Sequence, residues 1–319
     1  MRKALIVGIN DYKHVNPLKE CINDAKKIAE LLKKNFDNSR NFDVELITNS
    51  NELTVSKLSD KINELFAGDS DVALFYFSGH GFIDYNSDKS YLCTYETDEN
   101  NHGLEMGVVE NIISKSNAKN KIVFLDCCYS GMMGNTRNEN GIAKSSILYD
   151  NTTYLTASKK DETSVETKEG GIFTNLLVEA LSGSASDILG VITPASIYSY
   201  IDKSLGAWDQ RPIFKTSSSK FIDIRKVNPQ IDIKIIRNLV KYFEKPSSKY
   251  SLNPSFEETR QEHKKENVII FKELQKLVSV GLVKPDDEEY MYYAAINSKS
   301  CSLTMLGKNY WKWVNETRI

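Results

Sequence analysis

The sequence has 319 residues, of which 40% are hydrophobic and 26% are charged, and its formal net charge is −2. These proportions are typical of a soluble globular protein, and the small net charge gives no bulk electrostatic reason to expect binding to nucleic acid or anionic lipid. The five cysteines lack paired spacing and metal-ligand motifs, which disfavours a disulfide framework and structural zinc and favours a reducing, cytoplasmic setting. No apolar run approaches the about 18 residues of a membrane span, and the start of the chain reads as a strand rather than a signal peptide.

Strand and helix patterns alternate through the first part of the chain. Strands are predicted at 4–9, 42–48, 72–77, 91–94 and 121–125, and helices at 18–32, 54–66 and 108–116. This alternation predicts an α/β fold, with a parallel sheet and helices on both of its faces. The runs 72–77 and 122–125, the latter preceded by Lys121, are apolar throughout, as expected for buried parallel strands.

Residues 132–146 are rich in Gly, Asn, Ser and Lys and predict a mobile loop. Beyond them, we expect a strand at 153–158, a helix at 170–181, a helix capped by Thr193-Pro194 and an edge strand at 210–214. The remainder predicts helices at 232–243, 266–280 and 305–314, strands at 289–296 and 302–304, and a loose segment at 246–261. Gly281 is the expected C-terminal cap of the second of these helices.

Two predicted strand ends carry chemically useful side chains. Ser78-Gly79-His80-Gly81 follows one strand, and Asp126-Cys127-Cys128 follows another. Ligands in open α/β sheets bind just beyond the carboxyl ends of strands. If the two strands are neighbours, the imidazole of His80 and the thiol of Cys128 can act together as base and nucleophile. Successive side chains alternate along an extended chain, so Cys127 is expected to pack inward.

These two motifs, S-G-H-G and D-C-C-Y-S-G, resemble those of the caspase-like cysteine peptidases, and most closely the metacaspase branch. His80 precedes Cys128 by 48 residues, close to the roughly 50 of caspases. The Gln-Ala-Cys signature of caspases is absent, so animal caspases are the poorer match. The resemblance covers residues 1–225 and implies a caspase-like, mostly parallel sheet flanked by helices. Within that domain it implies a large-subunit-like part at 1–131, a linker loop at 132–146 and a small-subunit-like part at 147–225.

The resemblance implies a role for several residues. His80 and Cys128 would be catalytic, and the backbone amides of Gly81 and Cys128 could form an oxyanion hole. The substrate pocket would include Cys21, Asp24, Ser78 and Asp126. Two carboxylates in a cleft suit an Arg or Lys side chain, so cleavage after Arg or Lys is expected. The alternatives are that Asp24 is a solvated helix residue and that Asp126 only caps a loop.

Two further expectations concern loops of the same domain. With basic specificity, Arg137 or Lys144 could be a site of self-cleavage, the alternative being an ordinary surface loop. Calcium is a cofactor of many metacaspases, and oxygen ligands suit it. Acidic side chains do occur in the segment after His80, but their spacing matches no calcium-loop motif, so a solvated acidic stretch is the preferred interpretation. Those side chains are Asp84, Asp88, Glu96 and Asp98.

In the C-terminal part, 226–319, a predicted helix is followed by Gly281-Leu282-Val283, a predicted hairpin and the run L-T-x-L-G-x-x-Y-W at 303–311. This order resembles a winged-helix module, a small α+β regulatory or sensor domain. Residues 229–319 hold 15 basic and 12 acidic residues, a net of about +3 that does not favour nucleic acid. We therefore expect a protein or peptide substrate, with a partner protein or a nucleotide signal acting at the C-terminal domain. By analogy such a protein would be an effector of bacterial antiphage defence or cell suicide. The alternative is a catalytically silent scaffold, a class that usually lacks the His or the Cys.

Overall fold

The structure of the protein is a computed structural model that describes residues 1–319, except 128–134, 138–143, 147, 158–165, 168–169, 207–210 and 220–221. The chain forms two compact units. Unit 1 comprises Met1–Ser186 and Val191–Val227, and unit 2 comprises Asp187–Gly190 and Asn228–Ile319. Whether 1–225 and 226–319 fold independently as domains stays a prediction.

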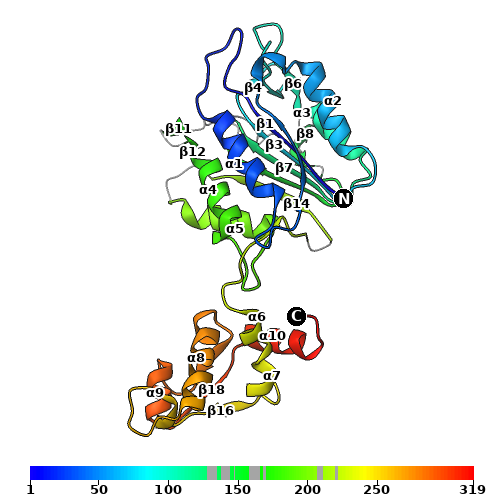
Figure 1. Ribbon diagram of the computed structural model, residues 1–319. Coiled ribbons are helices and arrows are strands. Elements are labelled where there is room, and N and C mark those ends of the chain that lie inside the picture. Colours follow the sequence, from blue (N-terminus) through cyan, green and yellow to red (C-terminus); the bar gives the residue numbers. More distant parts are fainter. Residues whose placement is uncertain are drawn as a thin grey trace. The chain divides into compact units, whose positions relative to one another are not determined.

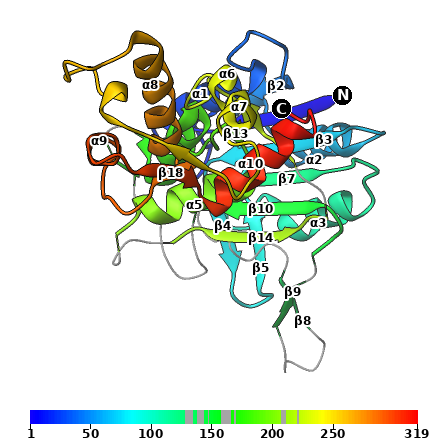
Figure 2. The ribbon, with the colours of Figure 1, turned by 90° about the horizontal axis from the view of Figure 1, so that it is seen from below.

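Unit 1 is built on a mixed sheet whose described strands run in the order β14-β10-β7-β3-β1-β2 (Figures 1 and 2). Neighbouring strands are parallel except for β10 and β14, which are antiparallel. The predicted α/β class with a mostly parallel sheet is therefore confirmed. The strands are β1 (Arg2–Gly8), β2 (Asp43–Ile47), β3 (Val72–Ser78), β7 (Lys121–Asp126), β10 (Thr152–Thr156) and β14 (Ile213–Ser217).

Helices cover both faces of this sheet (Figure 1). One face, called here the α1 face, packs against α1 (Cys21–Lys33), α4 (Ile172–Glu179) and α5 (Pro194–Ser204). The other, the α2 face, packs against α2 (Val55–Phe66) and α3 (Met106–Ser114). All residues of β3 and β7 are buried, and their side chains alternate between the two faces as a pleated strand requires. Thus Phe124 contributes to the α1 face and Leu125 to the α2 face.

Helix starts follow the predicted capping chemistry. The Thr54 side chain accepts a hydrogen bond from the Lys57 amide at the start of α2. Thr193 and Ser196 form a reciprocal capping box at the start of α5, with Pro194 in the first turn. Both arrangements satisfy amides that a helix cannot pair internally.

Unit 1 also contains several small sheets of two or three short strands. A three-stranded sheet consists of β4 (Gly81–Asp84), β5 (Lys89–Leu92) and β6 (Leu104–Glu105). Within the predicted loop 132–146, β8 (Asn135–Arg137) pairs with β9 (Lys144–Ser146), so that part of the loop prediction is wrong: the turn-forming composition favoured a loop but did not exclude a short hairpin. The other pairs are β11 (Glu166–Thr167) with β12 (Gly170–Gly171), and β13 (Val191–Ile192) with β15 (Arg225–Lys226).

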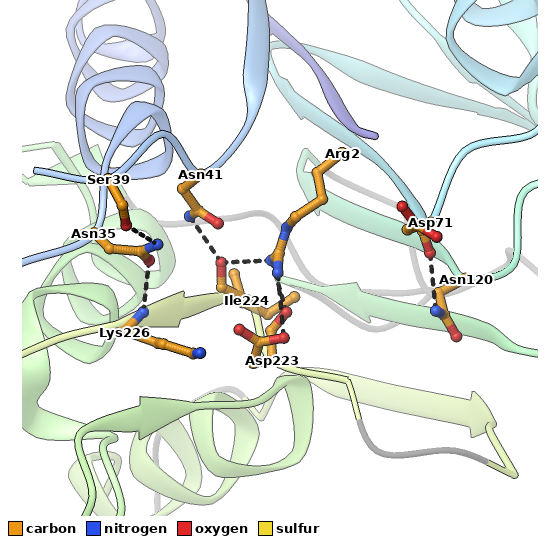
Figure 3. Close-up of polar contacts among 9 residues, drawn as sticks. All are labelled: Arg2, Asn35, Ser39, Asn41, Asp71, Asn120, Asp223, Ile224 and Lys226. Carbon is orange, nitrogen blue, oxygen red and sulfur yellow. Dashed lines mark hydrogen bonds and ion pairs between the residues drawn. The ribbon is translucent and has the colours of Figure 1, made fainter.

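The last segment of unit 1 is bound firmly to the start of the chain (Figure 3). The Arg2 guanidinium donates hydrogen bonds to the carbonyls of Asp223 and Ile224, at 2.7 and 2.9 Å, and lies 4.4 Å from the centre of the Phe42 ring. The Asn41 amide also donates to the Ile224 carbonyl. These contacts hold residues 223–224, which directly precede β15, against Arg2 of β1 and Asn41.

Unit 2 has its own apolar core and a three-stranded antiparallel sheet in the order β16-β18-β17. Its described elements are α6 (Ile233–Arg237), α7 (Leu239–Tyr242), β16 (Lys249–Ser251), α8 (Lys265–Ser279), β17 (Val283–Pro285), α9 (Met291–Ile296), β18 (Ser300–Leu303) and α10 (Met305–Asn315). Gly281 has φ +73° directly after α8, as its predicted capping role requires.

Three predictions for unit 2 are wrong. Residues 289–296 are not a strand, because 291–296 form α9, in which Met291, Ala294 and Ala295 are buried at helical spacing. The β-propensity of the tyrosines there misled the prediction. The predicted helix 232–243 is divided at Asn238, and the predicted loose segment 246–261 contains β16. With a helix between β17 and β18, the hairpin expected for a winged helix is not formed by 289–304, and that resemblance is not confirmed.

Among the helices that the structure describes, none has the length and hydropathy needed to cross a membrane.

Candidate active site

The ends of β3 and β7 form one edge. The two strands pair in parallel with Ser78 opposite Asp126, and the Gly79 amide donates a 3.3 Å hydrogen bond to the Asp126 carbonyl. The segments that begin with Gly79 and Cys127 therefore leave neighbouring strands at the same level. Cys128, the predicted nucleophile, lies outside the described residues.

Cys127 belongs to the core. Its side chain is only 1% exposed and packs on the α2 face with residues such as Leu125 and Tyr12. This agrees with the expectation that Cys127 packs inward, and it leaves a buried thiol that no substrate carbonyl can reach.

His80 is held at three points. Its Nε2 lies 2.8 Å from the Asn16 carbonyl, its backbone N–H donates a 2.7 Å hydrogen bond to the Tyr12 hydroxyl, and its ring centre is 4.9 Å from that of Tyr12. A carbonyl oxygen can only accept, so Nε2 carries the proton. In the neutral imidazole Nδ1 is then the basic nitrogen. The backbone therefore fixes both the position of the ring and the nitrogen that can exchange a proton.

Gly79 is required by close packing. A Cβ at this position would lie 2.8 Å from the Tyr12 hydroxyl and 3.0 Å from the Phe77 ring. No side chain can be added without displacing the hydroxyl that holds the His80 amide. Glycine at position 79 thus allows the Tyr12 hydroxyl to lie close enough to accept the hydrogen bond from the His80 amide.

The predicted pocket residues are buried at the α1-face side of the same edge. Asp24 is 1% exposed, Ser78 2%, Cys21 7% and Asp126 9%. The alternative of a solvated helix residue is therefore wrong for Asp24, whose carboxylate is 3.5 Å from the Lys27 ammonium. Burying two carboxylates at one sheet edge costs free energy unless each has a partner. Such burial is unusual outside functional sites.

A buried hydrogen-bond chain joins Asp126 to α4. Thr174 donates a 2.5 Å hydrogen bond to Asp126 Oδ2 and lies 2.7 Å from the Tyr76 hydroxyl. Thr174 has one hydroxyl proton, so Tyr76 must donate to Thr174. Burial raises the pKa of the Tyr76 phenol well above its ordinary value, and the nearby charges of Asp126 and Asp24 raise it further. The phenol consequently stays protonated and remains a donor.

The remaining predicted residues lie as follows. Gly81 begins β4 opposite Leu92, and Cys21 begins α1. A Cβ on Gly8 would lie 2.4 Å from the Cys21 carbonyl oxygen, so α1 starts directly against the end of β1. Arg137 and Lys144 lie opposite each other in the β8–β9 pair.

Three of the four acidic side chains considered for calcium accept hydrogen bonds from nearby groups of unit 1. Asp84 accepts from Asn86 and Ser87, Glu96 accepts from the Val55 amide, and Asp98 accepts from two amides that follow it. Among the described residues, no group of three or more His, Cys, Asp or Glu side chains has an arrangement that could hold a metal ion. The expectation of no cofactor, with calcium as the alternative, stays a prediction.

Three contributors were not identified from the sequence. The contact from Asn16 is made by its backbone carbonyl, so no side-chain pattern in the sequence could have predicted it. Tyr12 follows the predicted strand 4–9 and Thr174 lies in the predicted helix 170–181, but a hydroxyl that acts across 68 or 48 residues has no local signature.

Sequence comparisons relate the chain to known proteins. Residues 1–233 match the family model described as "Caspase domain". Metacaspase-1A of Aspergillus terreus is 35% identical over 88 residues, which are 25% of this chain and 21% of that protein. Metacaspase-1 of Meyerozyma guilliermondii is 31% identical over 102 residues, 28% of this chain and 24% of that protein. The match thus spans about a quarter or less of these curated relatives.

A solved structure is similar over a longer stretch. Protein GSU0716 from Geobacter sulfurreducens superposes with a TM-score of 0.52 at 19% sequence identity, covering 71% of this chain and 97% of that one. Caspase-1 from Spodoptera frugiperda gives a TM-score of 0.49 at 15% identity, covering 71% and 88% of the two chains.

Proposed function

The chain belongs to the caspase-domain family, a family of cysteine peptidases, and from this premise we propose that it is an endopeptidase with a Cys128–His80 dyad. The observation that carries the proposal is the pairing of Ser78 with Asp126, after which the segments that begin with Gly79 and Cys127 leave neighbouring strands at one edge. The burial of Cys127 supports Cys128 as the nucleophile, because it removes the neighbouring thiol from competition.

The proposed mechanism uses the fixed tautomer of His80. Nδ1 of His80 first takes the proton of the Cys128 thiol, and the resulting thiolate attacks the substrate carbonyl while the amides of Gly81 and Cys128 stabilise the oxyanion. The imidazole then protonates the leaving amine through Nδ1, which expels that half of the peptide and leaves a thioester on Cys128. Water hydrolyses the thioester and restores the thiol. Because Nε2 donates to the Asn16 carbonyl, the positive charge on the imidazolium is stabilised while the proton is held.

We propose that the residue before the scissile bond is Arg or Lys. Its binding site would comprise Asp24, Ser78 and Asp126, with Cys21 at the start of α1. The burial of both carboxylates supports this choice, since a bound guanidinium would offset their desolvation and could pair with both. An acidic substrate side chain would instead add a third negative charge to the site.

The test is hydrolysis of short fluorogenic peptides that end in Arg, Lys or Asp. Wild type should cleave the Arg and Lys peptides at least about a hundredfold faster than the Asp peptide, which is about 2.7 kcal/mol in transition-state free energy. Cys128→Ala should abolish turnover, whereas Cys127→Ala, the matched control, should retain it. Turnover that survives in Cys128→Ala rules out the nucleophile, and a preference for Asp rules out the pocket.

We also propose that unit 2 regulates the peptidase as a winged-helix-like or related sensor that responds to a partner protein or a nucleotide. On this proposal the protein is a cytoplasmic effector of antiphage defence or cell suicide. The presence of a second unit with its own apolar core supports a regulatory role for unit 2.

We further propose that the chain is cut after Arg137 or Lys144 during activation. Mass spectrometry of the incubated wild type should detect new ends after residue 137 or 144, and the same ends in Cys128→Ala would exclude self-cleavage.

A further inference from the structure

A pocket of about 710 Å³ opens beside His80. No residue of the proposed Arg or Lys site lines it. Its volume falls within the roughly 300–1,000 Å³ of pockets that bind organic ligands. Its lining includes Val15, His80, Phe82, Cys93, Asp98 and His102.

Aromatic rings form one wall of this pocket. The Phe82 ring centre is 4.4 Å from that of His102, with 31° between the ring planes. Tyr91 packs behind both rings, at 6.2 Å from Phe82 and 5.4 Å from His102. Phe82 nevertheless remains 37% exposed. A supported ring with an exposed surface can receive another ring by offset stacking or edge contact.

The wall is fixed in place by the backbone. Gly103 has φ +106°, and a Cβ there would lie 2.2 Å from the Leu92 carbonyl oxygen. The loop that carries His102 can therefore lie directly on β5 only because residue 103 is glycine. In addition, the Cys93 amide donates a 3.0 Å hydrogen bond to the His80 carbonyl. The pocket and the proposed general acid thus share a rigid support.

The chemistry of peptide cleavage decides which part of a substrate reaches the pocket. The proposed general acid gives its proton to the leaving amine, so the leaving segment passes next to the imidazole. Asp24 and Asp126 interact with Tyr76, which belongs to the α1 face, whereas Cys93 and Leu92 pack on the α2 face. A peptide that places its basic residue near the two carboxylates and crosses His80 therefore continues toward Phe82.

We propose that this pocket binds the side chain that follows the scissile bond and selects an aromatic residue there. This inference rests on the proposed peptidase function and extends it, from a basic residue before the cut to a basic–aromatic pair across it. Phe82 supplies the contact and His102 supports it. Asp98 and Glu99 line the same pocket and disfavour an acidic residue at that position.

The experiment measures binding separately from hydrolysis. Peptides of one sequence contain Arg followed by Phe, Leu, Gly or Asp, and their dissociation constants for full-length Cys128→Ala are measured by fluorescence anisotropy. The Arg-Phe peptide should bind about tenfold more tightly than the Arg-Gly peptide, equivalent to about 1.4 kcal/mol. Adding Phe82→Ala should bring the two constants within about twofold of each other. Tyr85→Ala, which changes a 62% exposed ring in the turn beyond β4, is the control and should keep the preference.

Each result has a distinct meaning. Equal affinity for the Phe and Gly peptides, or a preference that persists without Phe82, overturns the subsite. If Phe82→Ala is unfolded by circular dichroism, His102→Ala applies the same test to the same wall. Wild-type enzyme that fails to cleave the peptides it binds with a Phe preference overturns the peptidase proposal and leaves the pocket's selectivity standing.

Discussion

Replacing Thr174 by Val tests the buried hydrogen-bond chain that holds Asp126. Valine keeps the shape of threonine and removes only the hydroxyl, which donates to Asp126 and accepts from Tyr76. Loss of a hydrogen bond to a carboxylate costs about 1.5–3 kcal/mol, and loss of a neutral one about 0.5–1.5 kcal/mol. Ser78 also interacts with the Tyr76 phenol and can replace part of the second bond. We therefore expect Thr174→Val to destabilise unit 1 by about 2–4 kcal/mol.

Thr174→Ser is the matched control, because it keeps the hydroxyl and removes one buried methyl group, a loss of about 1 kcal/mol. Urea unfolding followed by far-ultraviolet circular dichroism gives the free energies, and hydrogen exchange of β3 and β7 assigns the change to unit 1. Tryptophan fluorescence would not suffice, since Trp311 and Trp313, two of the three tryptophans, lie in unit 2. A valine variant as stable as the serine variant would refute the role of the hydroxyl.

Further predictions concern pH, the chain start and the support of His80. Because burial raises the pKa of Tyr76, the folded state keeps the phenol proton above pH 10, where the unfolded state loses it. Stability should therefore fall above pH 10 by about 1.4 kcal/mol per pH unit for this group, and urea midpoints of Tyr76→Phe should decline less steeply; equal slopes would contradict this. Arg2→Met should lower stability by about 2–3 kcal/mol in thermal or urea unfolding, because two carbonyls lose a charged donor (Figure 3). Arg2→Lys should recover less than half of that loss, since one ammonium cannot reproduce the guanidinium geometry, and full recovery would argue against it. Tyr12→Phe should lower kcat for the Arg peptide about tenfold with little change in KM, because the His80 amide loses its acceptor, and an unchanged kcat would exclude this positioning role.

The sequence predicted the frame of unit 1 well because its signals are local. Apolar runs such as 72–77 and 122–125 are typical of buried strands, and alternation with amphipathic helices favours parallel pairing. The observed adjacency of β3 and β7 then brings Gly79 and Cys127, the first residues after Ser78 and Asp126, to one edge. The inward packing of Cys127 was predictable from strand alternation alone.

What the sequence could not predict depends on contacts between distant segments. The Tyr12–His80 and Thr174–Asp126 hydrogen bonds join parts of the chain that carry no shared pattern. In unit 2, the tyrosine-rich run at 290–293 has strand propensity, yet the burial of Met291, Ala294 and Ala295 on one side makes a helix more favourable. Tertiary packing overrode local preference at that point.

The most direct test of the central claim is the pH dependence of thiol alkylation at Cys128. The four described cysteines, Cys21, Cys93, Cys127 and Cys301, are buried and should react slowly; burial raises the pKa of Cys301 to about 12. If the imidazole of His80 stabilises the thiolate, iodoacetamide should modify Cys128 with an inflection at least about one pH unit below the roughly 8.5 of a free thiol. His80→Ala should return that inflection to about 8.5. Identical profiles for wild type and His80→Ala would show that the two groups do not act as a dyad.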